Sequence, residues 1–274
     1  MKKPENLLRR FMNKILSKQS SEIKDNVNYY KENQTNVASV NSYITNAFTE
    51  LIKQYSSKNF FKFVFNGIKM PLSLAEAKST KKFVDDINDK IGVDYTKEIK
   101  RTKLVSYMKA KTLENANLIT NMSQTNIKAA QTIITDGVNN GVHPSALVKD
   151  LQKQLNIGKK RAKIIARDQV AKIDSQVARK RSSQVGVKLF YWSSAKDDLT
   201  SGKPSGKYPN AKIKCWYISR KKTKHGTGIY SYKEGASYGG ENNLHPGTAH
   251  INCRCTAIPL IENVTYDPVK KERI

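Results

Sequence analysis

Cysteine, acidic residues and long apolar runs are all scarce in this chain. Its three cysteines, Cys215, Cys253 and Cys255, are an odd number and too few for a disulfide framework. No run approaches the roughly 20 apolar residues that a membrane-spanning helix needs. The basic opening stretch MKKPENLLRRFMNKIL is not followed by the apolar core of a secretory signal. We therefore expect a protein that is made in the cytosol and has no membrane partner.

The shortage of acidic residues leaves a large positive charge. There are 49 Lys and Arg against 23 Asp and Glu, a formal net charge of +26. Such a field attracts polyanions, and nucleic acid is the most obvious of these because its phosphates release counterions on binding. The ordinary alternative is an organism whose proteins are all rich in Lys, but such a chain would usually also be rich in Glu, and this one is not. An acidic protein is a second possible partner. The composition favours a polyanion that is bound without reading its sequence.

Residues 1–95 are expected to form a docking module of their own. Helices are predicted at its start, over SYITNAFTELIKQY and over SLAEAKSTKKFVDDINDK, with a polar stretch over residues 17–41 after the first of them. Asn66-Gly67 lies between two strand-like runs and predicts a hairpin over residues 60–72, because Asn-Gly favours the positive φ values of a tight turn. The phenylalanines of this hairpin could stack on bases, but a core or protein-docking role is more usual.

Residues 96–186 have a helical pattern. A long helix is expected to end near Gly137 and Gly141, and a short helix, PSALVKDLQKQL, follows it. Residues 158–186 then show the clearest apolar stripe of the chain, and the rest of this helix is basic. A basic face of this kind predicts contact with nucleic acid or an acidic protein, although a solvated face is the ordinary alternative. The candidate contact residues are Lys159, Lys160, Arg161, Lys163, Arg179, Lys180 and Arg181, together with Lys221 and Lys222 farther along the chain.

The pattern changes at residue 187. Residues 187–265 combine short strand-like pieces, VKLFYWSS, IKCWYIS, GIYSY and CTAIPLIE, with loops rich in Gly, Pro, Ser and Lys. Residues 266–274 are expected to be a loose polar tail. The predicted fold class is α+β, with a helical N-terminal and central part followed by a small loop-rich module that contains β-strands.

The stretch HPGTAHINCRCTAIPL holds two of the four histidines and two of the three cysteines. His250, Cys253 and Cys255 could hold zinc with Cys215 or His245 as a fourth ligand, because structural zinc sites use four imidazole or thiolate ligands. The C-x-C spacing closes less readily on one ion than C-x-x-C, which does not occur in the chain. The sequence therefore favours a buried turn without zinc, in which the cysteines pack as small apolar residues.

Two catalytic interpretations are also open for this stretch. A nucleophilic cysteine needs a base within reach and a third group that orients the base, and Cys253 with His250 or His245 meets only the first condition. A metal-dependent nuclease could use His245, His250 and Asn252 around an ion, but the strand-flanked histidine pair of the His-Asn-His enzymes is missing. We expect a protein that is not an enzyme and keep the nuclease as the alternative.

HINCRCTAIP resembles the terminal His-x-x-Cys-Arg-Cys-x-x-x-Pro signature of the phage Mu F-like minor head proteins, also called head morphogenesis proteins. The upstream order of features is similar over about residues 110–262. A long helix, a Gly-containing turn and a short helix precede a helix with an Ile-Ala-Arg-Asp motif, a Gly-Val strand that ends in Trp, and an Asp that opens a loop. The matching residues are Ile165, Ala166, Arg167, Asp168, Gly186, Val187, Trp192, Asp197 or Asp198, and Arg254 of the signature.

The loop after Trp192 departs from the family pattern. Many members carry Asp-x-Arg-Thr-Cys-x-x-Cys there, which together with the terminal signature suggests a metal-binding cluster. This chain reads DDLTSGKP from Asp197, without the Arg and without either Cys. Cys215 could compensate from a shifted position in the inserted loop.

The resemblance implies a virion protein that is made in the host cytoplasm and sits in a few copies at the portal vertex or in the capsid interior. The implied partners are portal protein, capsid shell and packaged double-stranded DNA, whose phosphates a chain of net charge +26 would neutralise without sequence specificity. The family has no established catalytic mechanism. Residues 1–95 lie outside the resemblance and are expected to dock on the portal or the shell.

Overall fold

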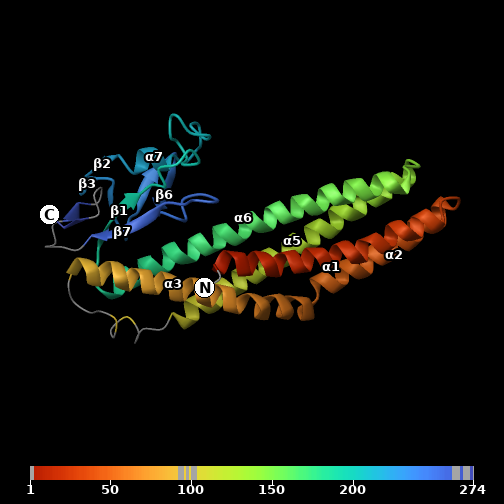
Figure 1. Cartoon of the computed structure of the whole chain (residues 1–274), viewed down its shortest axis with the longest axis horizontal. Helices are drawn as coiled ribbons and strands as arrows, with labels where there is room; N and C mark the ends of the chain where they lie inside the picture. Colours follow the sequence, from red (N-terminus) through yellow and green to blue (C-terminus); the bar gives the residue numbers. More distant parts are fainter. Residues whose placement is uncertain are drawn as a thin grey trace. The chain divides into compact units, whose positions relative to one another are not determined.

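The computed structural model describes residues 3–91, 96, 99, 104–260, 266–267 and 272–273. Long helices come first along the chain, and short strands and one short helix follow (Figure 1). The helices are α1 (Pro4–Glu32), α2 (Val37–Ser56), α3 (Lys58–Ile91), α5 (Val105–Asn139), α6 (Pro144–Gln184) and α7 (Cys215–Ile218). The strands are β1 (Leu189–Ser193), β2 (Lys222–Thr223), β3 (Gly226–Thr227), β4 (Ile229–Ser231), β5 (Ala236–Tyr238), β6 (Glu241–Leu244), β7 (Thr256–Leu260), β8 (Tyr266–Asp267) and β9 (Glu272–Arg273). The predicted α+β class is confirmed.

The chain divides into two compact units. Unit 1 comprises residues 1–72 and 106–166, and unit 2 comprises residues 73–105 and 167–274. The domain boundaries expected near residues 95, 186 and 265 stay predictions. Of the expected tail, only β8 and β9 lie within the described residues, where they pair antiparallel. No helix in the described part of the chain has an apolar stretch long enough to cross a bilayer.

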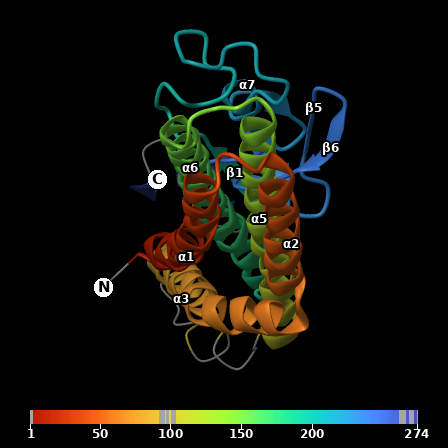
Figure 2. The same cartoon turned by 90° about the vertical axis from the view of Figure 1, so that its right-hand side faces the viewer.

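Unit 1 is a helical bundle in which α1, α2, α5 and the first part of α6 run alongside one another (Figure 2). Val40, Ile44 and Phe48 recur every fourth residue along α2 and are fully buried, as the helical period requires. Burying such a side chain stabilises the fold by about 1.5–3 kcal/mol. The buried amide of Gln19 in α1 donates to the carbonyl of Ser123 in α5 over 3.1 Å, so a polar group inside the bundle is also satisfied.

The opening helix is longer than the sequence pattern indicated. α1 continues to Glu32 through most of the polar stretch 17–41, because Ile23, Val27 and Tyr30 extend its buried side. The side chain of Asn36 then caps α2 by accepting a hydrogen bond from the backbone N–H of Ser39.

The expected hairpin over residues 60–72 is wrong, because α3 runs through this whole range. Val64, Ile68 and Leu72 are spaced by four residues and are all fully buried. A short apolar run fits a strand and a buried helix equally well, and only the length of the element separates the two. Here the helical spacing continues on both sides of the run, so the helix forms.

Gly67 has a packing role in α3 and is not a turn residue. A Cβ atom at this position would lie only 2.2 Å from the ring of Phe11 in α1. The glycine therefore permits the close approach of α1 and α3. Its exposed neighbour Asn66 faces solvent.

Two further helices differ from the expectation. The short helix after residue 143 and the basic helix after residue 158 are one helix, α6, because Gly158 packs closely against Asn126 and Leu16 without ending the helix. The piece IKCWYIS contains α7 where a strand was expected. Its backbone follows a helical pattern, in which the N–H of Ile218 donates to the carbonyl of Lys214.

Unit 2 is built on an antiparallel sheet with the strand order β4-β1-β7. The strands expected from VKLFYWSS, GIYSY and CTAIPLIE are confirmed as β1, β4 and β7. Phe190 and Trp192 alternate with more exposed residues along β1 and are fully buried, with ring centroids 6.5 Å apart. Period-two alternation therefore places the aromatic side of the central strand in the core, which also contains Cys215, Cys253 and Cys255.

Asn66 gives a direct test of the helix against the hairpin. We expect Asn66→Ala to raise the free energy of unfolding by up to about 0.7 kcal/mol, because alanine is the better helix former at an exposed position. In a tight hairpin turn the same change would be destabilising, since alanine disfavours positive φ. Urea unfolding followed by circular dichroism measures the change. Gly67→Val is the matched contrast: it should cost about 1–3 kcal/mol through overlap with Phe11, and less in a Phe11→Ala background.

Candidate metal centre and its surroundings

The three cysteines and His250 converge at one point in unit 2. Cys215 opens α7, whereas Cys253 and Cys255 lie in the segment that leads into β7, and all three side chains are buried. Their sulfur atoms lie within 4.8 Å of one another. The Cys215 and Cys253 sulfurs are 3.9 Å apart, and His250 Nε2 is 3.2 Å from Cys215 Sγ. The structure thus brings together the four residues that form the candidate ligand set.

The distance between the Cys215 and Cys253 sulfurs fits a tetrahedral zinc site. A zinc–sulfur distance of about 2.3 Å puts two thiolate ligands of a tetrahedral site about 3.8 Å apart, close to the 3.9 Å between Cys215 and Cys253. His250 Nδ1 is 2.9 Å from the carbonyl oxygen of Ile251. A carbonyl can only accept, so Nδ1 carries its proton and Nε2 is the nitrogen that faces the sulfur. The donor set is three thiolates and one imidazole.

Backbone and hydroxyl groups hold the cluster in place. The N–H of Gly247 donates to Cys253 Sγ over 3.3 Å, and the N–H of Cys215 donates to Ser201 Oγ over 3.1 Å. Ser201 Oγ also lies 3.2 Å from His250 Nε2. Ser201 occupies the place of the first cysteine in the Asp-x-Arg-Thr-Cys pattern. This loop therefore still reaches the cluster, while Cys215 supplies the sulfur. Only that family pattern could have singled out Ser201, and no sequence pattern marks Gly247.

The cluster shifts the pKa values of its own members. Hydrogen bonds with Cys215 and Cys253 raise the pKa of His250 to about 11. Hydrogen bonds from Cys215 and Cys255 lower the pKa of the Cys253 thiol, and hydrogen bonding with the other two cysteines together with burial raises that of Cys255. The metal-free cluster thus favours a thiolate at Cys253 beside a protonated His250. Metal binding at these atoms would release protons.

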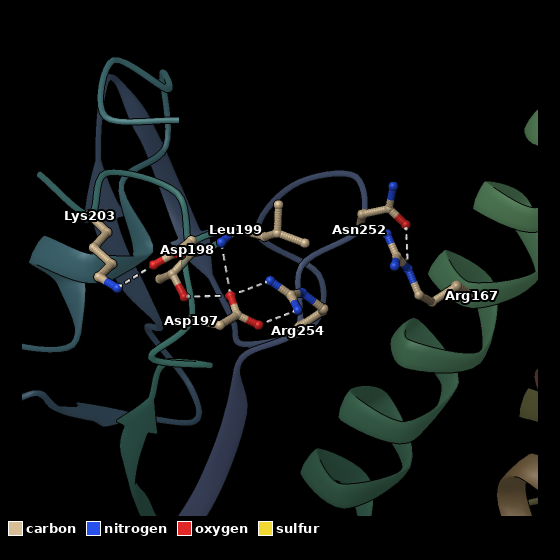
Figure 3. A network of polar contacts seen from close by, with 8 residues as sticks. Arg167, Asp197, Asp198, Leu199, Lys203, Asn252 and Arg254 are labelled. Carbon is tan, nitrogen blue, oxygen red and sulfur yellow. Dashed lines mark hydrogen bonds and ion pairs between the residues drawn. The ribbon is translucent and has the colours of Figure 1, made fainter. Parts of the chain in front are cut away.

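The Ile-Ala-Arg-Asp motif of α6 anchors the loop that carries the ligands. Asp168 Oδ1 accepts the backbone N–H of Asn252 over 2.8 Å. Arg167 Nε donates to Asn252 Oδ1 over 3.1 Å (Figure 3). Asn252 has a φ of 60°, a left-handed conformation that asparagine tolerates better than most residues. Asp168 is buried and also pairs with Lys172 over 2.7 Å. The motif therefore fixes the bend between His250 and Cys253.

Arg254 lies between two candidate ligands and points to the Asp197 loop (Figure 3). Both terminal guanidinium nitrogens bond the Asp197 carboxylate, one of them over 2.5 Å. These bonds lower the pKa of Asp197, which also accepts the backbone N–H of Leu199 over 3.0 Å. The expected motif residues Asp197 and Arg254 thus join the two loops of the site, whereas Trp192 lies in the core.

Comparison with known protein families gives a match over this part of the chain. Residues 128–258 match the family model described as Phage Mu protein F like protein, and the match contains every candidate ligand. These residues form a phage Mu F-like domain. The family suggested by the sequence is confirmed over these residues.

One curated relative is an uncharacterized protein from Haemophilus influenzae. It is 24% identical over 197 residues, which cover 70% of this chain and 38% of the relative. The chain thus matches well under half of that protein's length. No solved structure matches the chain.

His245 has a structural position in the Mu F-like domain. It is buried against Phe190, with ring centroids 5.7 Å apart, and its Nε2 lies 2.9 Å from Asn243 Oδ1. Burial and the charge of Arg179 lower the pKa of His245 to about 4, so the ring is neutral near pH 7. Asn252 is held by α6. These contacts give no support to a nuclease built on His245, His250 and Asn252.

Most of the predicted polyanion contacts are exposed. Unit 1 carries Lys159, Lys160, Arg161 and Lys163 on α6, and unit 2 carries Lys180, Lys221 and Lys222, with Arg179 half-buried. The two sets belong to different units. Each unit therefore offers basic side chains of its own.

Arg181 is an exception, because the structure buries it. The residue is 4% exposed, and its guanidinium donates to Glu76 Oε1 over 3.2 Å, to Thr80 Oγ1 over 3.3 Å and to the carbonyl of Ile99 over 3.2 Å. Removing one partner of a buried ion pair costs about 3–5 kcal/mol. Arg181 thus joins α6 to α3 within unit 2 and does not belong to the predicted contact surface.

Metal analysis tests the cluster. We expect about one zinc ion per chain in the purified protein, because three sulfurs lie within 4.8 Å of one another and His250 Nε2 lies 3.2 Å from one of them. Cys253→Ser should lose the ion and lower the melting temperature, whereas Ser201→Ala should retain the ion. Elemental mass spectrometry and thermal unfolding measure these effects. Cobalt substitution provides a check on the ligands, since bound thiolates give charge-transfer absorption. A metal-free protein whose Cys253→Ser variant melts like the wild type would exclude a structural metal centre.

Proposed function

We propose that this chain is a non-enzymatic minor capsid protein of a tailed phage, which links the portal or the shell to packaged double-stranded DNA. The observation that carries the proposal is the Mu F-like match over residues 128–258 in a chain of net charge +26. The protein resides in the virion, at the portal vertex or in the capsid interior.

The DNA contact is electrostatic. Lys159, Lys160, Arg161 and Lys163 are exposed on α6 within unit 1, and they can reach phosphates along a duplex. Lys221 and Lys222, at the start of β2, form a second basic surface in unit 2. Lysines on a helix or hairpin surface neutralise phosphates without reading base edges. This supports binding that is indifferent to DNA sequence.

The Cys/His cluster has a structural role in this proposal. Its sulfur atoms are buried, and its neighbours Asp168 and Arg254 are used to hold loops together. A centre with four protein ligands leaves no open position for a substrate or an activated water. The cluster therefore stabilises the loop-rich half of the Mu F-like domain.

The helices before the Mu F-like match supply the docking surface. Phe63 and Met70 of α3 are large apolar side chains that are more than half exposed. Phe63 also lies near Phe11, with ring centroids 5.5 Å apart. Apolar side chains that gather at a surface mark protein contacts more often than chance. We assign this surface to the portal or the shell.

Salt-dependent binding tests the DNA contact. We expect the protein to bind duplexes of unrelated sequence alike, with an affinity that falls steeply with salt. Replacing Lys159, Lys160, Arg161 and Lys163 by Ala should reduce the slope of log K against log salt by about 0.9 for each phosphate that is no longer neutralised. A variant with Ala at Lys14, Lys18, Lys53 and Lys58 removes the same charge from other helices of unit 1 and should change the slope less. Equal reductions in both variants would contradict a localised surface, and no binding at low salt would contradict the DNA contact itself.

Co-purification tests the docking surface. The protein should co-purify with portal or shell protein of the same phage when they are expressed together. Phe63→Glu with Met70→Glu should abolish this, because burying two carboxylates in an apolar interface is costly. Leu113→Glu, at another exposed apolar position of unit 1, is the matched control and should leave the complex intact. An unaffected complex in the double variant would place the contact elsewhere.

A further inference from the structure

Unit 2 has a hollow of about 840 Å³ beside the Cys/His cluster. Its walls are the loop of residues 199–213, the loop of residues 250–254 and one side chain of α6. We call it the basic groove. Its basic lining residues are Arg167, Lys207, Lys212 and Arg254, and its large apolar ones are Leu199, Tyr208, Ile213 and Ile251.

The charge of the groove favours an anionic ligand. Its lining includes four Lys or Arg side chains and no Asp or Glu. Arg254 pairs with Asp197, and Lys212 pairs with Glu241 over 2.6 Å, but all four of these side chains are solvent-accessible. Such pairs contribute about 1 kcal/mol or less, so a phosphate can compete for both cations.

Arg167 and Lys207 are available in different ways. Arg167 uses Nε to hold Asn252, and its two terminal nitrogens carry four further N–H donors in the fork geometry that matches a phosphate. Lys207 is exposed on the loop of residues 199–213. The two cations thus come from different elements that line the groove, and each can meet a phosphate of the same ligand.

The apolar side chains of the groove point to a ligand that also has flat apolar faces. Tyr208 is 55% exposed, Ile251 is 71% exposed and Leu199 is 41% exposed. Large apolar residues are seldom left at the surface together without a partner. An aromatic ring among cations is the composition of grooves that bind single-stranded nucleic acid, where bases stack on rings and phosphates meet Lys and Arg.

We propose that the basic groove binds a short single-stranded segment of nucleic acid, with phosphates at Arg167 and Lys207 and an unpaired base against Tyr208. A duplex does not satisfy this site, because its base faces are already stacked on one another. The inference rests on the proposed nucleic-acid function and adds a second site to it, distinct from the exposed cations of α6. An acidic peptide would use the cations but would have no base to place on Tyr208.

Fluorescence anisotropy with two labelled probes tests the site. The first probe is a single strand of about 8 nucleotides, within the range that small binding grooves cover, and the second is a longer duplex. We expect Tyr208→Leu to weaken single-strand binding at least fivefold, the effect of removing one stacked base, and to leave duplex binding within about twofold. Lys207→Ala should act in the same direction. Lys233→Ala, an exposed lysine of unit 2 outside the groove, is the matched control.

The outcomes separate this inference from the proposed function. Single-strand binding that is unchanged in Tyr208→Leu, or that falls equally in Lys233→Ala, would overturn the groove while duplex binding still supported the DNA contact. A poly-glutamate peptide of the same charge that binds the wild type as tightly as the single strand does would also overturn it, since the cations alone would then account for binding. Absence of binding to both probes at low salt would remove the proposed DNA function as well. Unchanged thermal unfolding of Tyr208→Leu shows that the variant is folded.

Discussion

The hydrogen bond between the buried Asp168 carboxylate and the backbone N–H of Asn252 fixes the loop that carries the Cys/His cluster. It joins residues 84 positions apart, and it does so at a bend where Asn252 adopts a left-handed conformation. His250 precedes the bend and Cys253 follows it, so this contact helps to set the position of both side chains. A buried carboxylate without its partners would be strongly unfavourable, which ties the stability of α6 to the geometry of the cluster.

Short-range patterns allowed much of this structure to be predicted. The α+β class, the strands β1, β4 and β7, and the family each follow from local spacing or from short motifs. The proximity of Cys215, His250, Cys253 and Cys255 was also predicted, because so few soft ligands occur in the chain, while their role as metal ligands stays a prediction. The prediction of a hairpin was wrong because the apolar run around Asn66-Gly67 fits a strand and a helix equally well. Gly67 is explained by its contact with Phe11 in another helix, and local spacing does not show such a contact. The role of Ser201 likewise depends on a contact between its loop and Cys215, and only the family's Asp-x-Arg-Thr-Cys pattern points to this residue.

The net charge of the chain shows that the protein attracts anions, but it does not show which Lys and Arg are exposed to bind them. Lys180 and Arg181 are neighbours in the same basic run, yet one is exposed and the other is buried among acceptors of α3. The partner Glu76 lies 105 positions from Arg181. Arg167 is the opposite case. It belongs to a motif that anchors a loop, and yet it also lines the basic groove.

The loop between Ser201 and Cys215 is closed at its base. The N–H of Cys215 donates to Ser201 Oγ, and the N–H of Gly202 donates to the carbonyl of Tyr208. Once the ends of a loop are fixed, doubling its length costs only about 0.6 kcal/mol of closure entropy. The tip around Pro204 and Ser205 is exposed and is thus a permissive site, where an epitope tag or a small fluorescent domain can be inserted to follow the protein while the cluster beneath it keeps its geometry.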